Sequence, residues 1–181
     1  MKKGLDFKEL FEQNARSLGD KNLLSFSDIK DKVLARILNY NELSGIPSNQ
    51  FEFYNKTLKG FRKGELTLIT GATGSGKTTF LSQLSLDFLT QGVPTLWGSF
   101  EIKNEILAST MLQQYSKKKL VDKKEERIDL LIEDFEQNPL YFMNFYGSTP
   151  IDLMFETLDY AIYAYDIQLI CIDNMQFMLS Q

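Results

Sequence analysis

Short apolar runs alternate with amphipathic stretches through most of this chain. The runs are rich in β-branched and aromatic residues and are short enough to be buried strands. They span 66–70, 95–100, 140–145 and 168–172. Between them, helices are predicted over 78–91, 104–115, 125–136 and 150–165. Apolar strands joined by helical crossovers predict an α/β fold with a parallel sheet that helices cover on both faces.

One more amphipathic helix is predicted ahead of these elements. Ile29, Val33 and Ile37 recur at helical spacing among charged residues, which predicts a helix over about 27–40. The apolar stripe of a lone helix must be buried somewhere. It packs either on the domain of its own chain or on another subunit, and the pattern alone does not choose between them.

Residues 41–60 are rich in Asn, Ser, Gly and Pro, which is typical of a linker. We therefore divide the chain at this point. Residues 1–57 form an N-terminal segment with the linker helix and a loop, and residues 58–181 form the compact α/β domain.

The turn after the first apolar run carries the most informative motif. Residues 71–78 are Gly-Ala-Thr-Gly-Ser-Gly-Lys-Thr, a complete phosphate-binding loop with a predicted strand before it and a helix after it. Its glycines let successive N–H groups point at phosphate oxygens, and the helix that begins near Lys77 adds the positive end of its dipole. A chance glycine-rich turn would not explain the flanking elements. The pattern predicts a site for ATP or another nucleoside triphosphate with Mg²⁺.

Each position of this loop has an expected role. Lys77 can reach the β- and γ-phosphates, and the Thr78 hydroxyl can ligate Mg²⁺. The nucleotide contacts are predicted at Gly71, Ala72, Thr73, Gly74, Ser75, Gly76, Lys77, Thr78 and Thr79.

Two acidic residues follow predicted strands at the edge where open α/β sheets bind ligands. Asp173 ends the apolar run 169–172 and is the expected water-mediated partner of Mg²⁺. A turn-capping role is an alternative for Asn174 more than for Asp173. Glu101 follows the second strand and could polarise the water that attacks the γ-phosphate. From spacing alone, a role for Glu101 as an acid at the start of a helix is equally well supported.

Composition narrows the chemistry further. The 181 residues are 43% hydrophobic and 13% aromatic, which fits a globular domain with a core, and no apolar run approaches the length of a membrane span. The chain has no histidine, so Ser-His-Asp and Cys-His catalysis and histidine-ligated zinc are excluded, and any general base must be a carboxylate or a lysine. Cys171 lies in an apolar run and is expected to be a buried thiol.

The net charge and the first ten residues say less about partners and targeting than the motifs say about chemistry. A net charge of −4 is slight evidence against nucleic-acid binding, because such sites are often local or shared between subunits. The first ten residues include acidic side chains and no apolar segment, so we expect neither a secretory signal nor a transit peptide.

Three segments besides the phosphate loop carry a family resemblance. They are Leu-Trp-Gly-Ser-Phe-Glu-Ile at 96–102, Leu-Tyr-Phe-Met at 140–143 and Ile-Asp-Asn-Met-Gln-Phe-Met at 172–178. Together they resemble the Twinkle family, the replicative helicases of mitochondrial DNA, which is related to the DnaB family and to bacteriophage primase-helicases. The resemblance runs from about Phe26 to the end of the chain, and the first and third segments are far more specific than the loop.

The resemblance implies a RecA-like P-loop ATPase core that assembles into a hexameric or heptameric ring. It implies 5′-to-3′ unwinding of DNA on single-stranded and forked substrates, in the mitochondrial matrix. It gives Glu101 the role of catalytic base and Asp173 that of the metal-water ligand, with the phosphate and metal roles on Gly71, Gly76, Lys77 and Thr78. It makes the helix at 27–40 a linker helix that packs on the neighbouring subunit.

The chain also departs from this family. A RecA-type core continues past the last predicted strand, and its sensor residue, DNA-binding loops and arginine finger are not among these residues. We therefore expect a helicase fragment that binds nucleotide weakly and hydrolyses it negligibly by itself. Two alternatives remain: a RecA-like ATPase that does not unwind DNA, and a P-loop nucleoside kinase. The kinase is less favoured, because Arg127 is the only arginine after Thr79.

Overall fold

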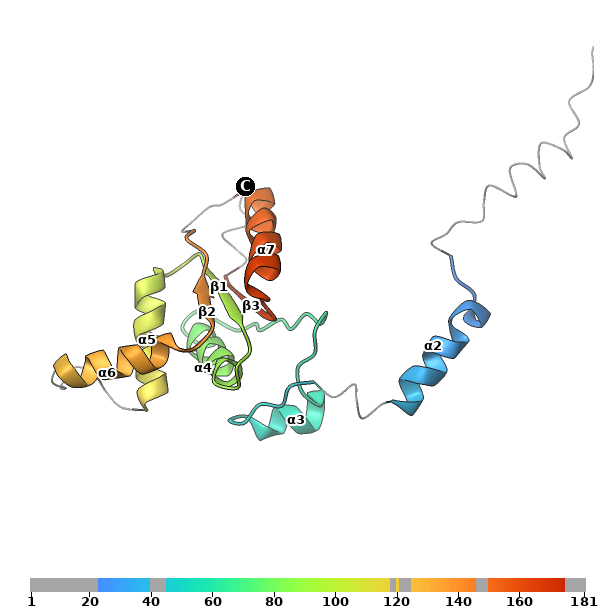
Figure 1. Ribbon diagram of the computed structural model, residues 1–181, viewed down its shortest axis with the longest axis horizontal. Coiled ribbons are helices and arrows are strands. Elements are labelled where there is room, and N and C mark those ends of the chain that lie inside the picture. Colours follow the sequence, from blue (N-terminus) through green and yellow to red (C-terminus); the bar gives the residue numbers. More distant parts are fainter. Residues whose placement is uncertain (1–22, 40–44, 118–119, 121–124, 146–149, 175–181) are drawn as a thin grey trace, which may run out of the picture. The chain divides into compact units, whose positions relative to one another are not determined.

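The computed structural model describes residues 23–39, 45–117, 120, 125–145 and 150–174 (Figure 1). The chain divides into two units, residues 1–44 and 45–181. The first unit contributes helix α2, Phe26–Leu38, which confirms the helix predicted over about 27–40. Its N-terminus is capped by the Asp28 carboxylate, which accepts a hydrogen bond from the backbone N–H of Ser25 at 2.8 Å. No residue of α2 is buried: within its own unit, Ile29 and Val33 of the apolar stripe are half-buried and Ile37 is exposed.

The second unit is built on a three-stranded parallel sheet with the strand order β2-β1-β3. The strands are β1 (Thr95–Ser99), β2 (Leu140–Phe142) and β3 (Leu169–Asp173). The prediction of an α/β fold with a parallel sheet is therefore confirmed. Strand β2 is shorter than the predicted 140–145, and one further hydrogen bond, from the Met143 N–H to the Trp97 carbonyl at 2.7 Å, continues its pairing with β1.

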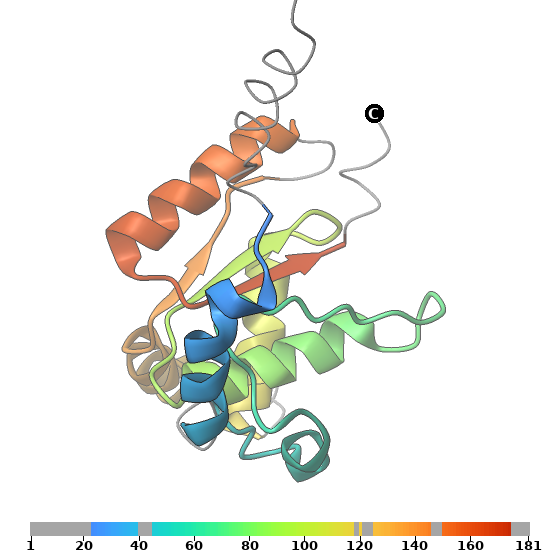
Figure 2. The same ribbon diagram turned by 90° about the vertical axis from the view of Figure 1, so that its right-hand side faces the viewer.

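Helices cover both faces of this sheet (Figure 2). Helix α7 lies on one face, and α4 and α5 lie on the other, with α6 packed against α5. Their bounds are α4 Lys77–Leu89, α5 Asn104–Ser116, α6 Glu125–Glu136 and α7 Ile151–Tyr165. All four agree closely with the predicted helices.

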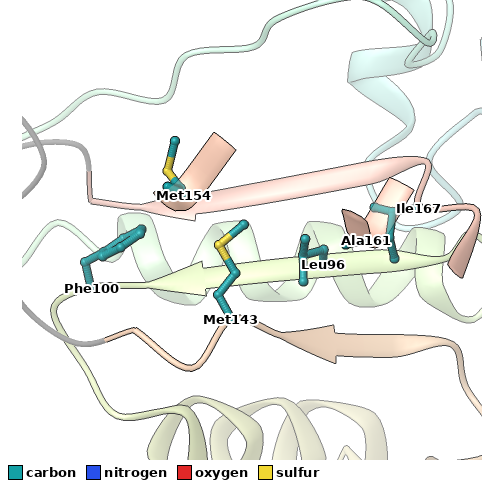
Figure 3. Packing of buried hydrophobic residues seen from close by; sticks show 6 residues of the cluster. All are labelled: Leu96, Phe100, Met143, Met154, Ala161 and Ile167. Carbon is teal, nitrogen blue, oxygen red and sulfur yellow. The ribbon is translucent and has the colours of Figure 1, made fainter. Parts of the chain in front are cut away.

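Strand β1 supplies both halves of the core, because its side chains alternate between the faces. Leu96 joins Met154 and Ala161 of α7 (Figure 3). Trp97 points to the other face, where it packs with residues of α4 and α5 and donates its indole N–H to the Ser85 hydroxyl at 3.0 Å. The central strand is thus buried on both sides, as expected for a parallel sheet.

The strand predicted over 66–70 is wrong in this structure. The segment has no strand pairing, and the side chains of Leu66 and Leu68 are 93% and 74% exposed. A cavity of about 440 Å³ is lined both by this segment and by 169–172 of β3. A strand needs a hydrogen-bonded neighbour, and none of the described strands pairs with 66–70. Apolar composition correctly marked a segment with the potential to form a strand, but pairing decides whether one forms.

The linker predicted over 41–60 is also wrong for the part that is described. Helix α3 (Glu52–Leu58) forms there, and Ile46 pairs with Phe61 in an isolated antiparallel bridge. The Ser48 hydroxyl donates to the Asp87 carboxylate of α4 at 2.5 Å, which attaches this segment to the core. Residues 41–44 lie outside the described part of the chain. None of the helices that the structure describes has the length and apolar character of a membrane span.

Candidate nucleotide-binding site

The phosphate-binding loop has the backbone conformation that its glycines permit. Gly74 and Gly76 have φ angles of 76° and 86°, in the left-handed region where a side chain would be strained. Gly76 is the N-cap of α4, and its carbonyl accepts the first helical hydrogen bond from the Phe80 N–H at 2.8 Å. Helix α4 therefore starts at Lys77, as predicted, and its amino-terminal N–H groups end in the loop.

The lysine of the motif lies against its own loop. The Lys77 ammonium donates to the carbonyl oxygens of Gly71 and Ala72, at 2.9 and 3.0 Å. A Cβ atom on Gly71 would approach the Ser75 hydroxyl to 2.9 Å, so any larger residue there would force the Ser75 side chain to move. The ammonium charge is thus placed within the loop, where the motif requires it for phosphate binding.

A second contact joins the loop to the sheet. The Thr78 hydroxyl donates to the Asp173 carboxylate at 2.6 Å, although the two residues are 95 positions apart in sequence. Asp173 is the last residue of β3 and is only 7% exposed. The two predicted metal ligands are therefore neighbours in the structure.

This pair fits a magnesium ion. Hydroxyl and carboxylate oxygens are the ligands that Mg²⁺ prefers, and it usually takes only one or two of them from protein and the rest from water and phosphate. The described residues contain no cluster of three or more His, Cys, Asp or Glu side chains that could enclose a metal.

Glu101 lies two residues beyond the end of β1, at the same edge of the sheet. Its Oε2 atom accepts a hydrogen bond from the side-chain amide of Asn174 at 2.8 Å. The alternative role, an acid in the first turn of a helix, belongs to Glu105, because α5 begins at Asn104 with Lys103 as its N-cap. Glu101 thus stands apart from the helix start and in contact with the residue after Asp173.

The remaining loop residues connect α4 to its neighbour α5. The carbonyl of Thr79 accepts hydrogen bonds from the Gln114 amide at 3.0 Å and from the Ser82 hydroxyl at 2.9 Å. Thr73 lies in the turn of the loop. Gln114 was not singled out by the sequence, because it lies in an ordinary helical pattern 35 residues from its partner.

Cys171 is buried, as predicted. Burial, with a smaller effect of the nearby Asp173 charge, raises the pKa of the Cys171 thiol to about 12. The thiol is therefore neutral at physiological pH, which makes it a poor nucleophile.

The contact between Glu101 and Asn174 was also missed. It joins residues 73 positions apart, and periodicity carries no information about such a pair. The only available signal was the position of Asn174 directly after an acid at a strand end.

A comparison with known families agrees with this geometry. The family model described as an AAA domain, AAA_25, matches residues 41–181, which include every described element of the second unit. That family contains P-loop NTPases of the DnaB/RecA-like helicase type. The complete phosphate loop, the parallel sheet and the acid at the end of β3 are the features expected of such an enzyme. The chain therefore belongs to the AAA_25 family of P-loop NTPases, and its parallel sheet with covering helices is the α/β fold expected of a RecA-like core.

Proposed function

We propose that this protein hydrolyses ATP to drive 5′-to-3′ unwinding of DNA as part of a ring helicase of the Twinkle type. The observation that carries the hydrolytic part is the hydrogen bond between Thr78 and Asp173, with Glu101 at the same edge of the sheet. This arrangement supports the proposal, because the phosphate-binding loop, two oxygen ligands of the kind Mg²⁺ prefers and a further carboxylate lie at one edge of the sheet.

The reaction follows from these groups. The N–H groups of the loop and the Lys77 ammonium bind the β- and γ-phosphates, and Thr78 would hold Mg²⁺ directly and Asp173 would hold it through water. When bound, Mg²⁺ neutralises negative charge on the phosphate oxygens. Glu101 accepts a proton from a water molecule whose oxygen forms a bond to the γ-phosphorus. The bond from that phosphorus to the bridging oxygen breaks, and ADP and inorganic phosphate leave.

The proposal that ATP hydrolysis drives DNA unwinding rests on the AAA_25 family and on the resemblance to the Twinkle family. The segments at 96–102 and 172–178 resemble Twinkle, and they contain Glu101 and Asp173, two of the residues proposed for catalysis. A mitochondrial location is proposed on the same ground. In the ring, a neighbouring subunit supplies the arginine that stabilises the transition state, which in related reactions is worth roughly 10³–10⁵ in rate.

Helix α2 supports assembly into a ring. Its large apolar side chains are exposed, with Leu34 at 57%, Ile37 at 65% and Leu38 at 73%. An exposed stripe of this kind is typical of a helix that docks on another subunit. Replacing Val33 and Ile37 with aspartate should shift sedimentation of the full-length protein from rings to monomers while the second unit stays folded. Unchanged rings would mean that α2 does not hold them together.

The decisive experiment compares two variants of the full-length protein. Lys77→Ala should weaken ATP binding and abolish turnover, because Lys77 contacts phosphate before and during the reaction. Glu101→Gln should bind a fluorescent ATP analogue and load on DNA with near-normal affinity, yet lose phosphate release and unwinding of forked DNA together.

Matched controls exist for both changes. Glu105→Gln makes the same chemical change in the first turn of α5, and Lys56→Ala removes an exposed lysine of α3; both should leave hydrolysis intact. Substantial phosphate release by Glu101→Gln would remove the residue from the mechanism. ATP hydrolysis without strand separation by the unmodified protein would favour the RecA-like ATPase that does not unwind DNA.

A further inference from the structure

Asn174 links the two strands that carry the candidate catalytic residues. It follows Asp173 at the end of β3, and its side-chain amide donates to Oε2 of Glu101, beyond the end of β1, at 2.8 Å. The adjacent residues Asp173 and Asn174 thus contact two different groups. Asp173 contacts the phosphate-binding loop through Thr78, and Asn174 contacts the proposed base.

The backbone holds both ends of this contact in place. Strands β1 and β3 are paired with Ser99 opposite Asp173, and the Phe100 N–H donates to the Asp173 carbonyl at 2.7 Å. The sheet therefore fixes the position of Asp173 relative to the end of β1, and Asn174 is the next residue along the chain. The position of the Glu101 carboxylate is not fixed in this way, because a glutamate side chain has three rotatable bonds and this one is exposed.

We infer that Asn174 is a positioning residue for ATP hydrolysis, which holds the Glu101 carboxylate ready to accept the proton of the attacking water. This inference rests on the proposed function. The amide of Asn174 engages Oε2, and the other oxygen, Oε1, then accepts the proton. An amide suits this role because it donates a hydrogen bond to the carboxylate while carrying no charge of its own.

The hydrogen bond between Asn174 and Glu101 can orient the Glu101 carboxylate, but it contributes little to core packing. Asn174 is only partly buried, so shortening its side chain removes little apolar contact and leaves no closed cavity. Substitution should therefore affect the chemical step more than the fold. Its effect on the chemical step should act through Glu101.

The test measures steady-state and single-turnover ATP hydrolysis in the full-length protein with Asn174→Ala. We expect kcat to fall by about 10- to 100-fold, as for a catalytic group that is misplaced by about 1 Å. The KM for ATP and the affinity for a fluorescent ATP analogue should stay within about twofold, since ground-state binding is unaffected. Asn174→Asp should be impaired at least as much, because a second carboxylate would repel Glu101. Asn49→Ala is the matched control, an exposed asparagine that should have no effect.

A double-mutant cycle separates positioning from a general structural role. In the Glu101→Gln background, Asn174→Ala should lower the residual rate by less than about twofold, because the group on which it acts is already disabled. A full additional loss in that background would overturn the inference. So would an unchanged kcat in the single variant, or an equal loss of ATP affinity and kcat. An unmodified protein that binds ATP without hydrolysing it would overturn the proposed function itself, and the inference with it.

Discussion

Two hydroxyl-to-aspartate hydrogen bonds tie α4 to distant parts of the second unit, one near each end of the helix. At the first turn, Thr78 donates to Asp173 at 2.6 Å. At the last turn, Ser48 donates to Asp87 at 2.5 Å. Both carboxylates are largely buried, with exposed fractions of 7% for Asp173 and 1% for Asp87. Burial and the type of partner therefore do not distinguish them.

The number of donors around each carboxylate does distinguish them. Asp87 also accepts from the Gln50 backbone N–H at 3.1 Å and from the Gln91 amide at 3.3 Å, so both of its oxygens have protein partners. For the Asp173 side chain, Thr78 is the one hydrogen-bond donor that the described residues supply. A buried carboxylate surrounded by protein donors holds the fold together, whereas one with a single donor at the carboxyl edge of a sheet retains lone pairs for water and a metal.

The largest expected effect is the loss of hydrolysis in Asp173→Asn. The amide oxygen can still accept the Thr78 hydrogen bond, so the melting temperature should change little. The negative charge that would hold Mg²⁺ through water is lost, and we expect phosphate release to fall by at least about 100-fold. Phosphate release and thermal melting of the full-length protein measure the two effects. Hydrolysis near the normal rate would show that Asp173 resembles Asp87 in function as well as in burial.

The same chemical change at the other end of α4 should give the opposite result. Asn in place of Asp87 has one acceptor oxygen, and its NH₂ group must face either the donors at Ser48 and Gln50 or the donor at Gln91. Wherever the NH₂ group faces another donor, neither of the two groups has an acceptor, and a buried group without a partner costs about 1–3 kcal/mol of folding free energy. Chemical denaturation of Asp87→Asn should show that loss, while ATP affinity and kcat of the folded protein stay near normal. A loss of kcat without a loss of stability would contradict the structural role.

The sequence predicts the pair Thr78 and Asp173 but not the pair Ser48 and Asp87. The phosphate motif and the strand-end acid were enough to predict the roles of Thr78 and Asp173, because a motif specifies its own structural context. Nothing marked Ser48 and Asp87, since Asp87 lies on a helix that was expected to bury only its apolar stripe. Helix α4 instead buries Ser82, Ser85 and Asp87 as well, each with a hydrogen-bond partner.

The elements themselves were predicted well wherever local pattern determines them. All four helices of the α/β domain and the three paired strands lie close to their predicted positions. The failures at 66–70 and at 45–58 have one cause: whether an extended segment pairs, or a polar segment packs, depends on distant residues. Leu66 and Leu68 have the composition of a buried strand but lack a pairing neighbour among the described strands.

A smaller loss of kcat than in Asp173→Asn is expected from a change at the centre of the sheet, where β1 pairs with β3 and so supports Asp173. A Cβ on Gly98 would lie 2.9 Å from the Ile172 Cδ1 and 3.1 Å from the Met143 Sδ. Both contacts are to side chains, which can shift at a cost, so Gly98→Ala should destabilise the protein by about 1–3 kcal/mol. Because Ile172 precedes Asp173, kcat should fall as well, whereas Asp87→Asn should leave it intact. Equal kcat values in the two variants would show that strain in β3 does not reach the site.

The smallest effect concerns Cys171, which lies on β3 two residues before Asp173 and faces α4. Its side chain is 4% exposed, and burial raises the pKa of its thiol to about 12. Alkylation requires both access and a thiolate, so iodoacetamide at pH 8 should label the native protein far more slowly than the protein in denaturant. Cys171→Ser should leave ATP affinity and kcat close to normal, because the thiol takes no part in the reaction, and mass spectrometry after timed alkylation measures the labelling. Fast labelling of the native protein that ATP suppresses would show instead that this end of β3 opens in solution, and the low exposure of Asp173 would then no longer describe the site that binds nucleotide.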